Sequence, residues 1–145
     1  MKRIMVSVAI LIASNSFSQV TETKKLATGT DGWRISMEVK NGKDTMTYFY
    51  YSYQNKAYKH IVDMSALYTR NKKELIDIAN GLKILSKKES GTEVQIKIGD
   101  YELRLYDFSD AIYIVDEDDK YTTISKENDV IMADEFIANA KFLRK

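Results

Sequence analysis

Residues 33–53, WRISMEVKNGKDTMTYFYYSY, carry the pattern that decides the fold. From Trp33 to Lys40, apolar and polar side chains alternate strictly, which is typical of a β-strand with one buried face. The pair Asn41-Gly42 that follows is a strong signal for a two-residue turn. The stretch therefore predicts an antiparallel hairpin whose second strand is rich in tyrosine.

A two-residue loop also sets the partners across this hairpin. The predicted cross-strand pairs are Met37 with Met46, Ile35 with Tyr48 and Trp33 with Tyr50. A four-residue loop would shift every partner by two and leave the faces unchanged. Tyr48 and Tyr50 are therefore predicted to lie in the core or at its rim, on the face that carries Trp33.

The opposite face is predicted to carry Phe49, Tyr51 and Tyr53 beside Arg34. If nothing covers this face, these four residues form an aromatic, ligand-binding platform suited to stacking on sugar rings or to gripping a peptide. The alternative is that a helix or a neighbouring chain covers the three rings. Exposure of the rings decides between the two readings.

Further elements follow along the chain. We expect a strand at about 60–68. A helix should follow, capped by Asn71, which can accept a hydrogen bond from a first-turn amide while Glu74 reaches back to it, and apolar residues recur at helical spacing from Leu75 to Leu85. In a second hairpin, Gly99-Asp100 joins residues 93–98 to 101–106. Strands at 111–116 and 120–125 and a helix at about 127–143 complete the order β-β-β-α-β-β-β-β-α. The sequence thus predicts an α+β fold, with an antiparallel sheet of about seven strands and two amphipathic helices packed on it.

The N-terminus has the layout of a secretory signal peptide. Lys2 and Arg3 precede an apolar run at 4–13, and small residues at Ser16 and Ser18 favour cleavage before Gln19. We expect residues 1–18 to be removed and residues 19–145 to form a single globular domain. The expected location is periplasmic or secreted, with no stable membrane insertion after cleavage, because the apolar run is too short to span a bilayer.

Composition narrows the classes of partner and chemistry. The chain has no cysteine, which excludes disulfides and cysteine-based zinc sites. It has 22 basic and 21 acidic residues, so nucleic acid is not an expected partner. The charges are unevenly spread: residues 19–97 hold 14 basic and 9 acidic side chains, and residues 98–145 hold 6 and 12. Such an asymmetry can steer a partner of opposite charge, unless folding mixes the two halves.

Catalytic and metal-binding patterns are weak. His60 is the only histidine, so a two-histidine metal site is impossible and no nucleophile motif accompanies it. Asp116, Asp118 and Asp119 are weak candidates for a cation site, since this acidic run lacks the features of an EF-hand loop, and a solvated turn is the simpler interpretation. No cofactor and no catalytic residue is expected.

Three functions remain open. The first is an exported, non-catalytic binding module for a protein or peptide of the cell envelope, of the inhibitor or immunity type. The second is a glycan-binding domain that uses exposed aromatic residues of a sheet. The third is a small hydrolase with a pair of carboxylates, which the sequence cannot single out among its acidic residues.

Overall fold

The computed structural model of the chain describes residues 21–57, 64–88 and 91–144. Four strands and a helix come first: β1 (Thr21–Thr28), β2 (Arg34–Lys40), β3 (Lys43–Gln54), β4 (Met64–Thr69) and α2 (Lys72–Ser86). The same layout then recurs: β5 (Glu93–Ile98), β6 (Tyr101–Phe108), β7 (Ala111–Val115), β8 (Tyr121–Ser125) and α3 (Lys126–Asn139). Two short 3-10 turns, η1 (Thr30–Gly32) and η2 (Ala140–Phe142), precede β2 and follow α3.

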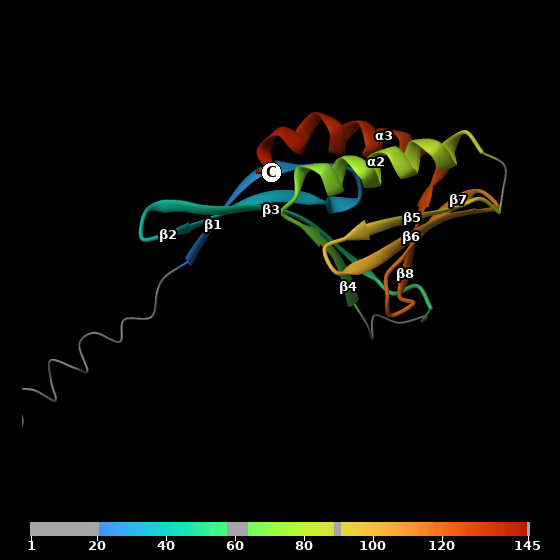
Figure 1. The fold of residues 1–145 in the computed structure, drawn as a ribbon, viewed down its shortest axis with the longest axis horizontal. Coiled ribbons are helices and arrows are strands. Elements are labelled where there is room, and N and C mark those ends of the chain that lie inside the picture. The colour runs from blue at the N-terminus through green and yellow to red at the C-terminus, as the bar shows by residue number, and fades with distance from the viewer. Residues whose placement is uncertain (1–20, 58–63, 89–90, 145) are drawn as a thin grey trace, which may run out of the picture.

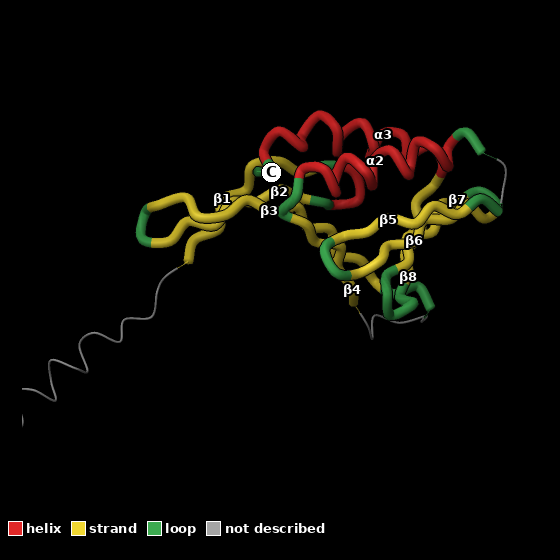
Figure 2. The backbone as a smooth tube through the Cα atoms, in the orientation of Figure 1, coloured by secondary structure: helices red, strands yellow, loops and turns green. Residues whose placement is uncertain are grey.

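Each set of four strands forms its own antiparallel sheet, with the strands in sequence order. Both helices lie side by side in one layer against the two sheets (Figures 1 and 2). The predicted α+β class, with antiparallel pairing and two packed helices, is confirmed. The eighth strand is β1, whose sequence TETKKLAT is mostly exposed and polar and so lacks the apolar alternation by which strands are recognised. The predicted signal peptide and residues 60–63 of the predicted third strand lie outside the described residues.

A β-bulge in the first hairpin overturns the predicted faces. The turn is as expected, with positive φ at both Asn41 (53°) and Gly42 (72°). The register then shifts between Glu38 and Val39, where Thr45 has no partner on β2. Beyond the bulge, Ile35 pairs with Phe49 rather than Tyr48, because one extra residue sends every later side chain to the other face.

The second hairpin follows its prediction throughout. Ile98 pairs with Tyr101, and Lys97 pairs with Glu102 on the opposite face. The register continues without a break to the pair Glu93 and Tyr106. Leu103 and Leu105 are buried as expected.

The two helices connect the sheets, because each packs against residues from the other half of the chain. Helix α2 ends the first half of the chain but packs on β5 and β6 of the second sheet. Gly81 permits this close approach, because a Cβ atom there would lie 2.9 Å from side-chain carbons of Ile96 and Leu105. Helix α3 in turn places Phe136 against Trp33 and Phe49 of the first half, with ring centroids 5.5 and 4.9 Å away.

Ser125 caps helix α3, because its hydroxyl accepts a hydrogen bond from the Asn128 amide. Its buried stripe contains Met132, Ala133, Phe136 and the following Ala140, whereas Val130 and Ile137, which helical spacing also assigns to the stripe, are exposed. The carboxylate of Glu135 accepts hydrogen bonds from the Trp33 indole and from Thr30, and so fixes η1 to this helix.

Candidate functional site: the cleft beside strand β4

The three aromatic residues predicted to form a surface platform lie in the core. Phe49, Tyr51 and Tyr53 are 0%, 4% and 5% exposed. Burial, above all, raises the pKa of Tyr51 to about 12 and raises that of Tyr53 as well. The bulge at Thr45 is the reason, because it turns these rings to the buried face of the sheet. The alternative prediction, that a helix covers this face, is correct for Phe49, which packs on Phe136 of α3.

Arg34 alone of the four proposed ligand-binding residues is exposed. Its guanidinium carbon lies 4.8 Å from the centroid of the Tyr50 ring, on the sheet face away from the helices. Tyr48 and Tyr50 are half-buried on this face, and Tyr48 packs on Tyr68 with centroids 5.4 Å apart. The predicted core pair and the predicted surface trio have therefore exchanged places.

The acidic turn is organised by its own hydrogen bonds. Asp116 Oδ1 accepts from the amides of Asp118 and Lys120, each at 3.0 Å, and Oδ2 accepts from the Ser65 hydroxyl. Asp119 pairs instead with Arg104 on β6. In the part of the chain that the structure describes, no three potential metal ligands converge. The three aspartates therefore lie together only as parts of one turn, and this turn contacts β4 at Ser65.

Two carboxylates do meet in the interior. Asp107 on β6 and Asp129 on α3 are both fully buried, and the Asp107 carboxylate raises the pKa of Asp129, in addition to the larger effect of burial. Lys126 Nζ lies 3.0 Å from Asp107 Oδ1. A substrate cannot reach either group, so this pair does not form the open carboxylate site that a hydrolase needs. His60 lies outside the described residues.

A cleft lies where β4 faces two turns of the second sheet. It has two adjoining hollows, of about 440 and 210 Å³, and both are lined by Tyr68 and Tyr101. We name it the β4 cleft. Its other lining residues are Thr69, Arg70, Asn71, Glu74, Ile98, Gly99 and Asp100 in the larger hollow, and Ser65, Ala66, Asp116, Glu117 and Asp118 in the smaller one.

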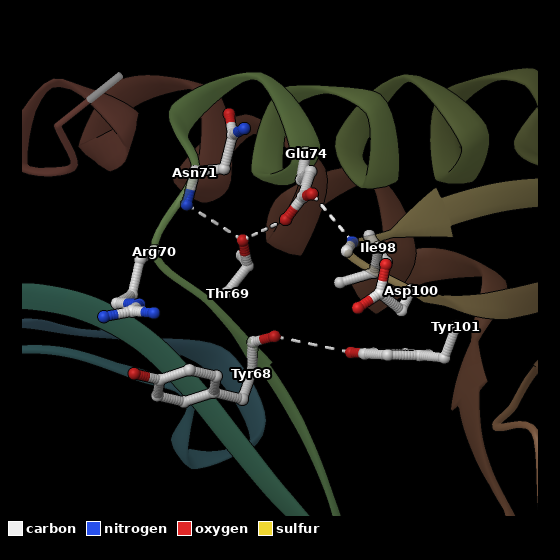
Figure 3. Close-up of a pocket in the computed structure, with 9 residues that line it drawn as sticks. Tyr68, Thr69, Arg70, Asn71, Glu74, Ile98, Asp100 and Tyr101 are labelled. Carbon is white, nitrogen blue, oxygen red and sulfur yellow. Dashed lines mark hydrogen bonds between the residues drawn. The ribbon is translucent and has the colours of Figure 1, made fainter.

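Hydrogen bonds across the cleft hold its two walls together. The Tyr101 hydroxyl donates to the backbone carbonyl of Tyr68 at 3.4 Å (Figure 3). Glu74 accepts from the Thr69 hydroxyl with one oxygen and from the Gly99 amide, at 2.8 Å, with the other. The predicted capping role of Asn71 is confirmed, since its side chain accepts from the Lys73 amide, but Glu74 joins the two walls rather than reaching back to Asn71.

The cleft has a negative electrostatic character. Its described lining contains five acidic side chains and one basic side chain, Arg70, which stands on the wall opposite Asp100 and Tyr101 (Figure 3). Burial raises the pKa of the Tyr101 hydroxyl, and the nearby carboxylates of Glu74, Glu117 and Asp116 raise it further. The acidic excess of residues 98–145 therefore persists in space at this site.

A second aromatic surface lies on the outer face of the second sheet. Tyr106 stacks on Tyr113 with centroids 4.8 Å apart, Tyr121 lies 5.4 Å from Tyr113, and Phe108 at the end of the row is 60% exposed. We name these four residues the aromatic row. Tyr106 and Tyr113 stack on each other, so much of their ring faces is covered, and Phe108 offers the largest exposed surface.

Sequence reasoning missed both surfaces for different reasons. The residues of the β4 cleft come from a strand end, a helix start and two turns. No local sequence pattern indicates that these segments lie together. The aromatic row did have a signal, because Tyr106 and Phe108 alternate with buried Leu105 and Asp107. That alternation was sufficient to place both rings on the outer face of β6.

Comparisons with known proteins give no relative: no protein-family model, no curated protein and no solved structure matches the chain. None of the described helices combines the length and apolar character that crossing a membrane requires.

Proposed function

We propose that the chain is an exported, non-catalytic binding module that holds a protein or peptide of the cell envelope in the β4 cleft. Export rests on the sequence of residues 1–18, and mass spectrometry of the mature protein should find its N-terminus at Gln19. The binding role rests on the cleft.

The observation that carries the proposal is the side-chain composition of the cleft and its margin. Tyr68 is 38% exposed and Tyr101 half-buried at its centre, while Met64, on the same face of β4, is 52% exposed. Tyrosine, methionine and arginine are enriched at protein interfaces, where they supply large contact areas with a polar end. Arg70 adds a planar group with five donors at one wall.

Site-specific photo-cross-linking tests the proposal without knowledge of the partner. A benzophenone amino acid replaces Ala66, an exposed residue of the cleft, in cells that produce the full-length protein. We expect one discrete cross-linked product that contains a second protein or a peptide. The Tyr68→Ala variant should reduce its yield, because truncation of a central tyrosine typically weakens an interface strongly.

The matched control places the same photoreactive residue at Ala138. This alanine is also exposed but lies on α3, in the helical layer. If the two positions give the same products, or if only the Ala138 variant cross-links, the partner does not bind in the β4 cleft and the proposal is wrong.

Glycan binding is the second candidate, and the exposure of Phe108 in the aromatic row favours it. Apolar faces of sugar rings stack on exposed aromatic side chains. The test is binding of the purified protein to immobilised cell-envelope polysaccharide, compared with the Phe108→Ala variant. Retention that is lost in this variant would support the glycan-binding function, and equal retention would exclude the aromatic row as a glycan site.

A further inference from the structure

We propose that the β4 cleft is specific for a basic segment of its partner, with a lysine or arginine side chain seated in the smaller hollow between Tyr68, Tyr101 and the turn at 116–118. This inference rests on the proposed binding function and specifies the chemistry of the partner. It is carried by the shape and the charge of the hollow together.

The walls of the smaller hollow suit a long cationic side chain. Tyr68 and Tyr101 both line it, and Ala66 fills little of it because its side chain is a single methyl group. The methylene groups of lysine or arginine pack on aromatic rings, and their charged ends are attracted to the ring faces. A volume of about 210 Å³ accommodates one such side chain but not a folded element.

Charge at the far side of the hollow completes the match. Glu117 and Asp118 are exposed at its rim, and Asp116 is half-buried between them and β4. No basic side chain is among the described residues that line this hollow. A cation placed there is attracted by the exposed carboxylates of Glu117 and Asp118 and by the charge of Asp116, whose oxygens already accept hydrogen bonds. An anionic group would be repelled, so the site discriminates by charge.

The larger hollow extends the same preference. Glu74 and Asp100 add two carboxylates, and Arg70 is the single basic group among the described residues that line it. Glu74 already accepts hydrogen bonds from Thr69 and Gly99, so it contributes its charge rather than a free acceptor. A partner segment that runs along β4 therefore passes five acidic groups and can place one acidic group beside Arg70.

Three fluorescein-labelled decapeptides of the same length test the inference. Each alternates threonine with a second residue, which is arginine, serine or glutamate, and binding to the mature protein is followed by fluorescence anisotropy. We expect the arginine peptide to bind at least about tenfold more tightly than the serine peptide, and the glutamate peptide to bind weakest. Raising the salt concentration should weaken the arginine peptide most.

Two double variants test whether binding depends on the charges of this site or on the net charge of the protein. Glu117→Gln/Asp118→Asn should weaken the arginine peptide about threefold to tenfold. The matched control, Glu22→Gln/Asp44→Asn, removes the same two charges from exposed positions of the first sheet and should leave binding unchanged.

The outcomes distinguish this inference from the function on which it rests. Equal binding of the arginine and serine peptides, an equal loss in both double variants, or no binding of any peptide would overturn the basic specificity. Cross-linking at Ala66 but not at Ala138 would still uphold a binding module in each of these cases. A failure of that cross-linking would overturn the function itself.

Discussion

The two hairpins of this protein look alike in sequence and differ in structure by one residue. Both have a two-residue turn with glycine and an alternating first strand. In the β5–β6 hairpin the register runs unbroken from the turn, and Leu103 and Leu105 are buried as the alternation predicts. In the β2–β3 hairpin the unpaired Thr45 reverses every face beyond it.

Alternation along a strand identifies the buried face only where the two sets of side chains differ in polarity. Residues 101–106, YELRLY, separate charged from aliphatic side chains, so only one register buries the leucines. Residues 48–51, YFYY, are four aromatic residues in succession, and either face can be buried at similar cost. The choice then depends on what covers the strand, and Phe136 and Trp33 cover Phe49.

The largest expected effect is the contrast between two neighbouring aromatic residues. Phe49→Ala should lower the free energy of unfolding by about 3–5 kcal/mol, because the ring is fully buried between Trp33 and Phe136. Tyr50→Ala should cost about 1 kcal/mol, since Tyr50 is half-buried and contacts Arg34. Urea denaturation of both variants measures the difference. Pairing of β2 and β3 without the bulge would bury Tyr50 in place of Phe49, so it predicts the reverse order. A larger loss of stability for Tyr50→Ala would therefore support the pairing without the bulge.

The turns should respond alike in both hairpins. Asn41→Val and Gly99→Val should each cost about 1–2 kcal/mol, because φ is 53° at Asn41 and 59° at Gly99, and β-branched residues disfavour positive φ. Asn41→Gly and Gly99→Asn are the controls, since both replacements tolerate positive φ and should cost less. Thermal or urea denaturation provides the measurement. A loss at only one turn would mean that the hairpins differ in more than the bulge.

The smallest expected effect concerns two buried carboxylates, one of which lies on β6 in the hairpin that has no bulge. Asp107 on β6 lies in the core, and its neighbour Asp129 has a raised pKa because of burial first and of the Asp107 carboxylate second. The folded state therefore binds this proton more tightly than the unfolded chain, and stability is lost as pH rises through the folded pKa. Asp129→Asn should raise the free energy of unfolding at neutral pH and change it little at about pH 3, below the unfolded pKa.

Urea denaturation across this pH range measures the effect of Asp129→Asn. Glu127→Gln, an exposed carboxylate in the same helical turn, is the control and should not stabilise the protein at neutral pH. If Asp129→Asn destabilises the protein at neutral pH, the ionised carboxylate has a stabilising contact and the expected sign of the effect is wrong.

Much of the fold was predictable because the deciding signals are local. The turns at Asn41-Gly42 and Gly99-Asp100, the cap at Asn71 and the buried positions of α2 from Leu75 to Leu85 follow from residues close in sequence. The functional site was not predictable in the same way. Phe49, Tyr51 and Tyr53 were expected at a surface and lie in the core, and the β4 cleft combines residues from Ser65 to Asp118.

The sequence by itself determined the α+β class, two hairpins, both helices and the acidic character of residues 98–145, because turn chemistry, caps and periodicity act over a few residues. Only the tertiary structure decided which face of β3 is buried and which segments meet at β4. The physical reason is that aromatic side chains in succession fit either face of a strand. Packing against α3 and the second sheet, which are distant in sequence, then selects the bulge, the core and the cleft.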